Sequence, residues 1–164
     1  MDRRKALKNI GTGFGAIAVT PTVVSLFQRC QSAATYAPVY FSPSDFENIL
    51  QLMELIIPAT DIPGAIELKL PEFTDSYIAS VWDEDRQGKF AEGWKVFLTA
   101  SAAISGKGVD QMNASDWDVV LSKYLKPGSE ISGAENDAAS FASQLRSLTA
   151  VSYTHLTLPT ILLV

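Results

Sequence analysis

The sequence predicts an all-α fold, a small bundle of four to five helices that follows an N-terminal signal segment. In successive segments, apolar residues recur at the three- and four-residue spacing that places them on one face of a helix. Cap residues, prolines or glycines bound each of these segments, and before Val151 no segment alternates polar and apolar residues as a strand does. With 164 residues, 47% of them hydrophobic, the chain is long enough for one domain with its own core.

The first predicted helix begins after Ser42. Ser42 is a suitable cap, Pro43 suits the first helical position, and Asp45 three residues later resembles a capping box. Pro58 ends this helix, because the residue before a proline is disfavoured in the helical region. Its apolar positions are Phe46, Ile49, Leu50, Met53, Ile56 and Ile57.

Two further helices are predicted between residues 65 and 106. One or two helical turns at 65–70 precede a helix that starts at Pro71-Glu72, and Asp83-Glu84-Asp85 starts the next, where negative charge favours a helix N-terminus. Gly106 and Gly108 end the second of these helices. The expected buried faces are Phe73, Tyr77, Ile78, Val81 and Trp82, and then Phe90, Trp94, Phe97 and Leu98.

Two more helices complete the bundle. The fourth is expected to be capped by Ser115 and to end at Pro127-Gly128, and the last begins at about Glu135. Their apolar positions are Trp117, Val120, Leu121, Tyr124 and Leu125, and then Phe141, Leu145 and Leu148.

The charge is distributed unevenly along the chain. The net charge is −5, but 35–150 carries only eight lysines and arginines against seventeen aspartates and glutamates, a net charge of −9. An acidic body argues against binding to nucleic acid, whose phosphates need a basic surface. Cys30 is the only cysteine, which excludes an internal disulfide and a metal site built from several cysteines.

Residues 1–34 have the layout of an export signal: basic residues, then a mildly apolar run, then small residues. Arg3 and Arg4, followed by "KALK", resemble a twin-arginine (Tat) signal, the kind that exports folded and usually cofactor-loaded proteins. A membrane anchor is the alternative, although the apolar run is short and rich in glycine for a span. "SAA" at 32–34 suits a signal peptidase, and Cys30 is an alternative lipidation site.

The C-terminal segment 151–164 differs in character from the helices before it. "VSYTHLTLPT" can be encoded by GTC TCT TAT ACA CAT CTG ACG CTG CCG ACG, which resembles a transposon-end sequencing adapter translated in frame. We therefore predict that 151–164 is an artefact tail and that His155, the only histidine, is not native. A genuine C-terminal strand is the alternative.

No group of residues in the sequence suggests catalysis. Without His155 there is no base for a hydrolytic triad, and the ligands of a zinc site are absent. The carboxylates at 83–85 are interpreted as a solvated helix start, with a calcium site as the weaker alternative. Asp61 is expected to cap the turn at 62–64 rather than to react. Core packing is expected for Trp82, Trp94 and Trp117, with anchoring of a partner as the alternative for one or two of them.

The stretch "LIIPATDIPGAIELKLPEFTDSYIASVWDEDRQGKFAEGW" resembles the small subunit (subunit 3, or gamma) of the gluconate 2-dehydrogenase family. The family pattern combines "IIPxTDTPGA", "VPxFID", an aromatic-rich helix and an acidic cluster. Ile62 stands where the family pattern commonly has a threonine, and Trp94 stands where it usually has a leucine. The resemblance covers 42–150 within a domain placed at 35–150, and it implies that a C-terminal segment is missing after Ala150.

The resemblance also implies what the chain does. Such subunits accompany a large FAD-containing flavoprotein of the glucose-methanol-choline (GMC) type, and often a cytochrome with haem c, in a periplasmic complex associated with the inner membrane through the signal or a partner. The flavoprotein oxidises a sugar or sugar acid, and the small subunit carries the export signal. No catalytic, cofactor or metal residue is therefore expected here. A free-standing exported binding protein or lipoprotein is the alternative, and an independent enzyme is the weakest reading.

Stiff loops present a surface at low entropic cost, so the loop after the first helix is interpreted as a structural joint or a docking element. Its residues are Pro58, Thr60, Asp61, Pro63, Gly64, Pro71 and Phe73.

Overall fold

The computed structural model describes residues 36–126, 131 and 133–161. The chain divides by its contacts into two units, and the account below concerns the unit that starts at Ala37. In the described residues this unit contains five α-helices and no strand, which confirms the all-α prediction. The helices are α3 (Pro43–Ile56), α4 (Leu70–Val81), α5 (Glu84–Ser105), α6 (Ala114–Leu125) and α7 (Asn136–Ile161), with short 3-10 turns η1 (Val109–Gln111) and η2 (Gly133–Glu135).

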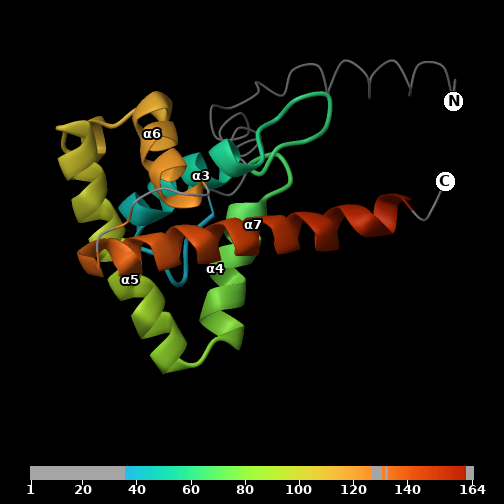
Figure 1. Cartoon of the computed structure of the whole chain (residues 1–164). Helices are drawn as coiled ribbons and strands as arrows, with labels where there is room; N and C mark the ends of the chain where they lie inside the picture. The colour runs from blue at the N-terminus through green and yellow to red at the C-terminus, as the bar shows by residue number, and fades with distance from the viewer. Residues whose placement is uncertain (1–35, 127–130, 132, 162–164) are drawn as a thin grey trace, which may run out of the picture. The chain divides into compact units, whose positions relative to one another are not determined.

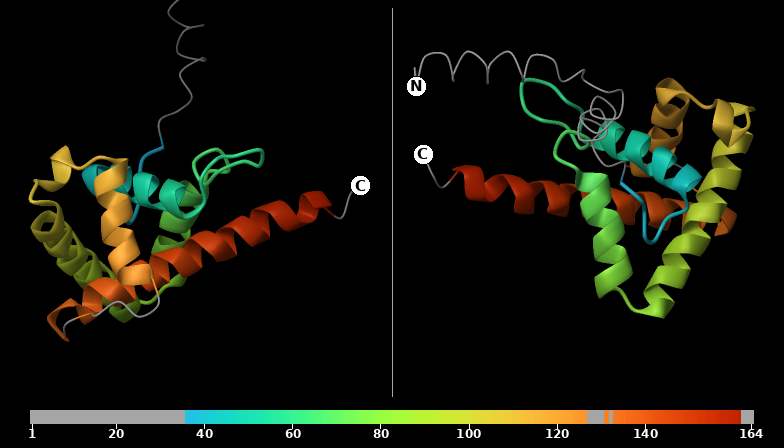
Figure 2. Two further views of the ribbon diagram at one scale, coloured as in Figure 1. Left: turned by 45° about the horizontal axis from the view of Figure 1, so that its top comes forward. Right: turned by 180° about the vertical axis from the view of Figure 1, so that it is seen from behind.

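The helices pack around two that are joined by a short connection. Figure 1 shows α4 and α5 as a V closed where they are joined, with α7 crossing both arms and α3 and α6 towards the open end. Figure 2 shows the same arrangement from two other sides, and in every view the C-terminal turns of α7 extend beyond the other helices. Among the helices of the described residues, none combines the length and the apolar character of a membrane span.

α3 begins and ends as the sequence predicts. Ser42 is the N-cap, and its Oγ accepts the backbone N–H of Asp45 at 3.1 Å, while Pro43 occupies the first turn. The helix ends at Ile56, next to the residue that precedes Pro58. Its buried side chains are Phe46, Ile49, Leu52 and Met53, so Leu52 takes the inward position that the sequence analysis gave to Leu50.

The boundaries of α5 are also confirmed. The Asp83 carboxylate accepts the backbone N–H of Arg86 at 2.8 Å, which makes Asp83 the N-cap. At the other end Gly106 has a φ of 67°, the left-handed conformation in which glycine commonly ends a helix. The predicted turns at 65–70 are present and lead into α4 through Lys69, whose positive φ is unusual for a residue other than glycine.

α6 and α7 differ from the prediction at one end each. The N-cap of α6 is Asn113 rather than Ser115, because the Asn113 side chain accepts the backbone N–H groups of both Ser115 and Asp116. α7 continues as a helix from Asn136 to Ile161, so the alternative of a C-terminal strand after Val151 is wrong. In this region the hydroxyl of Thr157 donates to the backbone carbonyl of Tyr153 within the helix.

The core is a cluster of aromatic rings between α5, α6 and α7. The ring of Phe141 lies 4.8 Å from Phe90, 5.1 Å from Trp94 and 5.2 Å from Phe97, and Phe97 stacks on Trp117. Burial of one such side chain contributes about 1.5–3 kcal/mol. Gly93 lets α5 approach α7 closely, because a Cβ there would lie 3.1 Å from the Cβ of Phe141.

Candidate functional site

One side chain of α3 holds the loop between α3 and α4, the predicted joint. The Glu54 carboxylate accepts the backbone N–H of Ala59 and that of Ile66, each at 2.9 Å. Gly64 packs directly against these hydrogen-bonded groups, because a Cβ there would lie 2.5 Å from the Ala59 nitrogen and 2.6 Å from Oε1 of Glu54. The geometry requires glycine for close packing, and it supports the interpretation of the loop as a joint.

Within the joint, Thr60 and not Asp61 makes the turn. The backbone N–H of Thr60 donates to the carbonyl of Ile62 at 3.0 Å, and the Thr60 hydroxyl accepts the Ile62 N–H at 3.4 Å. The prediction that Asp61 caps this turn is therefore wrong, since the hydroxyl of the preceding residue already occupies that position. Asp61, Pro58 and Pro63 are exposed on the loop surface.

Asp75 is a buried anchor that the sequence analysis missed. Its Oδ2 accepts the backbone N–H of Val39 at 2.7 Å, and its Oδ1 accepts those of Tyr40 and Phe41 at 3.0 and 2.9 Å. A buried carboxylate is stable when several donors satisfy it. Asp75 thereby fixes the segment that leads into α3 against α4. The available signal was an aspartate four residues after Pro71, on the side of the helix that also carries buried Ile78.

The anchor explains why the predicted buried face of α4 is partly wrong. Asp75 and Thr74 are completely buried together with Leu70, Pro71 and Ile78. The large side chains expected inside, Phe73, Tyr77 and Val81, are exposed by 41%, 36% and 61%. Phe73 and Tyr77 stack on each other with ring centroids 6.0 Å apart. Pro71 thus belongs to the core, whereas Phe73 belongs to the surface.

All three tryptophans are buried, as the core-packing prediction requires. Trp117 is fully buried, Trp94 is 5% exposed and Trp82 is 6% exposed. The indole N–H of Trp94 donates to Oδ1 of Asp45 at 2.8 Å, which connects α5 to the capped end of α3. The guanidinium carbon of Arg86 lies 4.0 Å from the ring centre of Trp82, a cation–π contact.

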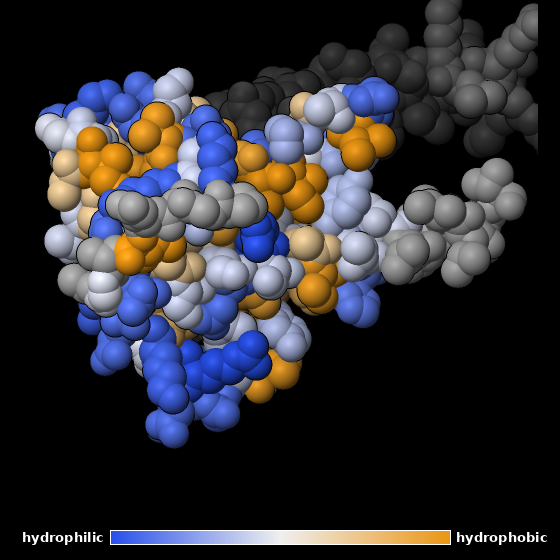
Figure 3. All heavy atoms as spheres, in the orientation of Figure 1, coloured by the Kyte–Doolittle hydropathy of each residue, from blue (hydrophilic) through white to orange (hydrophobic). Residues whose placement is uncertain are grey.

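The carboxylates at 83–85 form a solvated helix start. Asp83 caps α5, and Glu84 and Asp85 are exposed in its first turn, where they interact favourably with the helix dipole. Figure 3 shows hydrophilic residues gathered at the lower end of the viewed face, over the connection between α4 and α5. Among the residues that the structure describes, no group of three or more His, Cys, Asp or Glu is placed to hold a metal ion.

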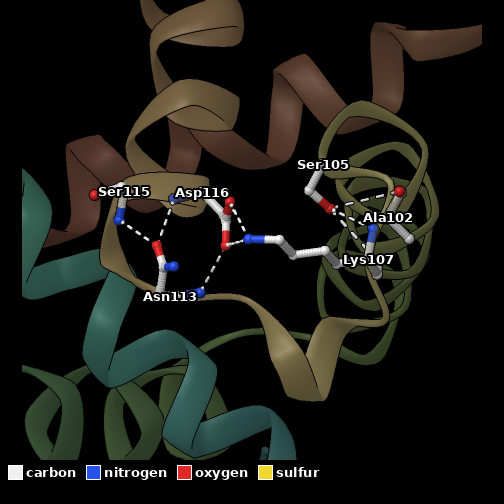
Figure 4. A network of polar contacts seen from close by, with 6 residues as sticks. All are labelled: Ala102, Ser105, Lys107, Asn113, Ser115 and Asp116. Atoms are coloured by element: carbon white, nitrogen blue, oxygen red, sulfur yellow. Dashed lines mark hydrogen bonds and ion pairs between the residues drawn. The ribbon is translucent and has the colours of Figure 1, made fainter.

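A polar network connects the end of α5 to the first turn of α6. In Figure 4, Asn113 and Asp116 face each other as a capping box, and Lys107 reaches across to Asp116 at 2.8 Å. The hydrogen bond from the Asn113 backbone, followed by that from Lys107, lowers the pKa of Asp116. The network stabilises the connection between α5 and α6 and contains no nucleophile paired with a base.

A second polar cluster joins α6 to η2. Glu135 accepts hydrogen bonds from Lys123 and from the hydroxyl of Tyr124. Burial, together with the hydrogen bond to Glu135, raises the pKa of Tyr124 above its usual value. The cluster thereby connects α6 to η2.

A groove of about 680 Å³ lies between α4 and α7 and is here called the α4–α7 groove. Phe73 and Tyr77 line one wall, and Trp82 with Arg86 closes the end where α4 and α5 meet. The opposite wall is one face of α7 from Ser143 to Leu156. The groove is mostly apolar and open to solvent, which suits the binding of an apolar segment better than proton transfer.

Comparison with known proteins identifies the family of the chain. The sequence model of the family described as Gluconate 2-dehydrogenase subunit 3 matches residues 43–156. The chain belongs to this family. No curated protein and no solved structure matches it.

Membership in the subunit 3 family defines the coarse function, that of a subunit of a dehydrogenase assembly, which implies partner subunits. The matched region starts at the first residue of α3 and includes the joint, the Asp75 anchor and the α4–α7 groove. It ends at Leu156, inside the segment that resembles translated adapter. Arg3, Arg4 and Cys30 lie outside the described residues.

Proposed function

We propose that this chain is a non-catalytic small subunit of a periplasmic, membrane-associated dehydrogenase complex, in which it carries the export signal and docks to an FAD-containing GMC-type flavoprotein. The observation that carries the proposal is the α4–α7 groove, an exposed apolar site in a member of a subunit family. Exposed apolar patches of this kind mark protein interaction sites. The flavoprotein oxidises the sugar or sugar acid, and a cytochrome with haem c receives the electrons.

The sequence of the leader supports the export part of the proposal. Arg3 and Arg4 stand where a twin-arginine signal requires them, and such a signal serves partners that fold before they cross the membrane. Within the described body, the clusters of charged residues are engaged in caps and anchors, as Asp75, Asp83 and Asp116 illustrate. Chemistry on a sugar is therefore assigned to the flavoprotein partner.

Co-expression tests both parts. The full chain is produced with a GMC-type flavoprotein from the same genome, with an affinity tag on the flavoprotein. We expect the two to co-purify from the periplasm, with flavin and sugar-acid oxidation in the complex and neither in the purified small chain. The double change Arg3→Lys and Arg4→Lys should retain both proteins in the cytoplasm, whereas Lys5→Arg, a control in the same segment, should leave export unchanged.

Two results would contradict the proposal. Export of the flavoprotein alongside the Arg3→Lys, Arg4→Lys chain would overturn the carrier role. Isolation of the chain as a monomer that does not bind the flavoprotein, with lipid attached at Cys30, would favour a free-standing lipoprotein instead.

A further inference from the structure

The α4–α7 groove leaves aromatic surface unpartnered. Phe73 and Tyr77, stacked on each other, remain exposed by 41% and 36% although they stand on a helix whose opposite side is fully buried. On α7, Leu148 lines the same groove before the adapter-like segment, and Val151 and Leu156 line it within that segment. Burial of such partly exposed apolar side chains is favourable, because it removes their surface from water. A ligand that covered them would gain substantial apolar stabilisation.

The charge of the groove is opposite to that of the body. Its lining includes Arg86 and contains no aspartate or glutamate, although the body from 35 to 150 carries a net charge of −9. The two ion pairs in the described part of the chain are Lys107–Asp116 and Lys123–Glu135, so Arg86 belongs to neither. Arg86 lies on Trp82 at the rim, where it is available to a carboxylate on the ligand.

The size of the groove indicates a single segment as its ligand. Twelve residues line it, fewer than the roughly 20–30 residues a side of a standard protein interface. The α7 wall runs from Ser143 to Leu148 before the adapter-like segment, and that segment extends it to Leu156, a total helical length of about 20 Å at 1.5 Å per residue. A single short helix covers the wall in either case, and helices commonly bind such grooves through apolar anchors one turn apart.

A second copy of this chain is a poor ligand. A symmetric pair joined through the groove has the same lining on both sides, and this lining contains no aspartate or glutamate that could pair with Arg86, while the pair brings two bodies of net charge −9 together. Like charges brought together in an interface are unfavourable. A partner with its own carboxylate removes this conflict.

We propose that the α4–α7 groove binds an amphipathic helix of the flavoprotein subunit, with apolar side chains against Phe73 and Tyr77 and a carboxylate paired with Arg86. This assignment rests on the proposed function and names the docking surface that the proposed function requires. Val151, Ser152, His155 and Leu156 fall in the adapter-like segment. The test therefore relies on residues of the α4 and α5 wall, which precede Val151.

The experiment measures the affinity of the full chain for the tagged flavoprotein by surface plasmon resonance. Tyr77→Glu places a charge against the apolar wall, and Arg86→Glu reverses the charge at the rim. Both should weaken binding about tenfold or more, as loss of an interface anchor does. Val119→Glu, at a valine of α6 that is 59% exposed, and Arg146→Glu, at an exposed arginine of α7 outside the lining, are the matched controls and should change the Kd less than about twofold.

Further measurements check the folding of the variants and define the ligand. Thermal unfolding followed by circular dichroism verifies that Tyr77→Glu and Arg86→Glu are folded, and Phe73→Ser provides a milder variant of the same wall. Hydrogen exchange in the complex should show added protection in α4, in residues 143–150 of α7 and in one helix of the flavoprotein. Exchange of that helix's carboxylate for lysine should restore the binding of Arg86→Glu.

The outcomes separate the two proposals. If the wild-type chain binds the flavoprotein and the groove variants bind equally well, the groove assignment is wrong and the proposed function stands. If the wild-type chain does not bind the flavoprotein at all, the proposed function fails. If the wild-type chain dimerises and Tyr77→Glu abolishes the dimer, the ligand is a second copy and the assignment is wrong.

Discussion

The carboxylate of Asp75 on α4 accepts the backbone N–H of Phe41 at 2.9 Å, across 34 residues of sequence. Together with the bonds from Val39 and Tyr40, it holds the chain where it enters the helical body. Each hydrogen bond to a charged group contributes about 1.5–3 kcal/mol, and a buried donor left without a partner costs about 1–3 kcal/mol.

We therefore expect Asp75→Ala to lower the free energy of unfolding by roughly 3 kcal/mol or more, as measured by urea denaturation at neutral pH. Asp75→Asn should lower it less, because its remaining oxygen still accepts two N–H groups while its amide faces the third. Asp118→Ala, at an exposed aspartate on α6, is the control and should change stability little. Equal stability of Asp75→Ala and the wild type would refute the anchor.

Gly64 and Gly88 offer a matched pair of substitutions. Gly64→Ala forces a Cβ to within 2.5 Å of a backbone nitrogen of the joint, so we expect a loss of about 1–3 kcal/mol. Gly88 lies exposed in α5 with nothing within 4 Å of a new Cβ, so Gly88→Ala should stabilise the protein by about 0.5–1 kcal/mol. Opposite signs in urea denaturation would support the close packing at the joint, and equal effects would argue against it.

The cap of α6 can be tested with two neighbouring residues. Asn113→Ala removes the acceptor of two backbone N–H groups and should cost about 1 kcal/mol. Ser115→Ala removes a hydroxyl that lies inside the helix and should leave stability unchanged or slightly raised. Thermal melts that showed the reverse order would restore Ser115 as the cap.

Asp116 makes stability depend on pH in the acidic range. Its pKa in the folded protein lies below that in the unfolded chain, so the unfolded chain takes up protons first as the pH falls. The stabilisation is complete above the unfolded pKa of about 3.9 and is lost as the pH falls through the folded pKa. Asp116→Asn should therefore be less stable than the wild type at pH 7, with the difference shrinking below about pH 4. A difference that persists undiminished at low pH would contradict this assignment.

The origin of 151–164 can be decided at the level of DNA. We predict that direct sequencing of amplified genomic DNA will show the natural reading frame departing from the present one after Ala150, with the adapter-like codons of Val151–Thr160 absent. A genomic sequence that encodes "VSYTHLTLPT" would establish the segment as native, including His155 in the α4–α7 groove.

Local sequence signals predicted most of the helix boundaries. Ser42-Pro43 and Asp83 start their helices, and Pro58 and Gly106 lie where helices end, because caps, prolines and left-handed glycines act through bonds within a few residues. At α6 the sequence analysis placed the cap at Ser115, whereas the side chain of Asn113, two residues earlier, accepts the backbone N–H groups of the first turn.

The inward face of α4 could not be predicted in the same way. Apolar periodicity favoured Phe73 and Tyr77 as core residues, whereas burial of Asp75 depends on donors that lie 34 to 36 residues away. The α4–α7 groove depends on the packing of helices that are distant in sequence, so no local pattern indicated it. Of the predicted joint, Gly64 and Pro71 are structural, and Phe73 lines the groove instead.

The hydrogen bonds of Asp75 also bear on how the leader can be processed. The N–H donors of Val39, Tyr40 and Phe41 come after the small-residue stretch at 32–34 where a peptidase would act. Trimming the leader, retaining it or attaching a lipid at Cys30 would each leave these donors in place. The same three bonds to Asp75 are therefore available to a released form of the protein and to a tethered one.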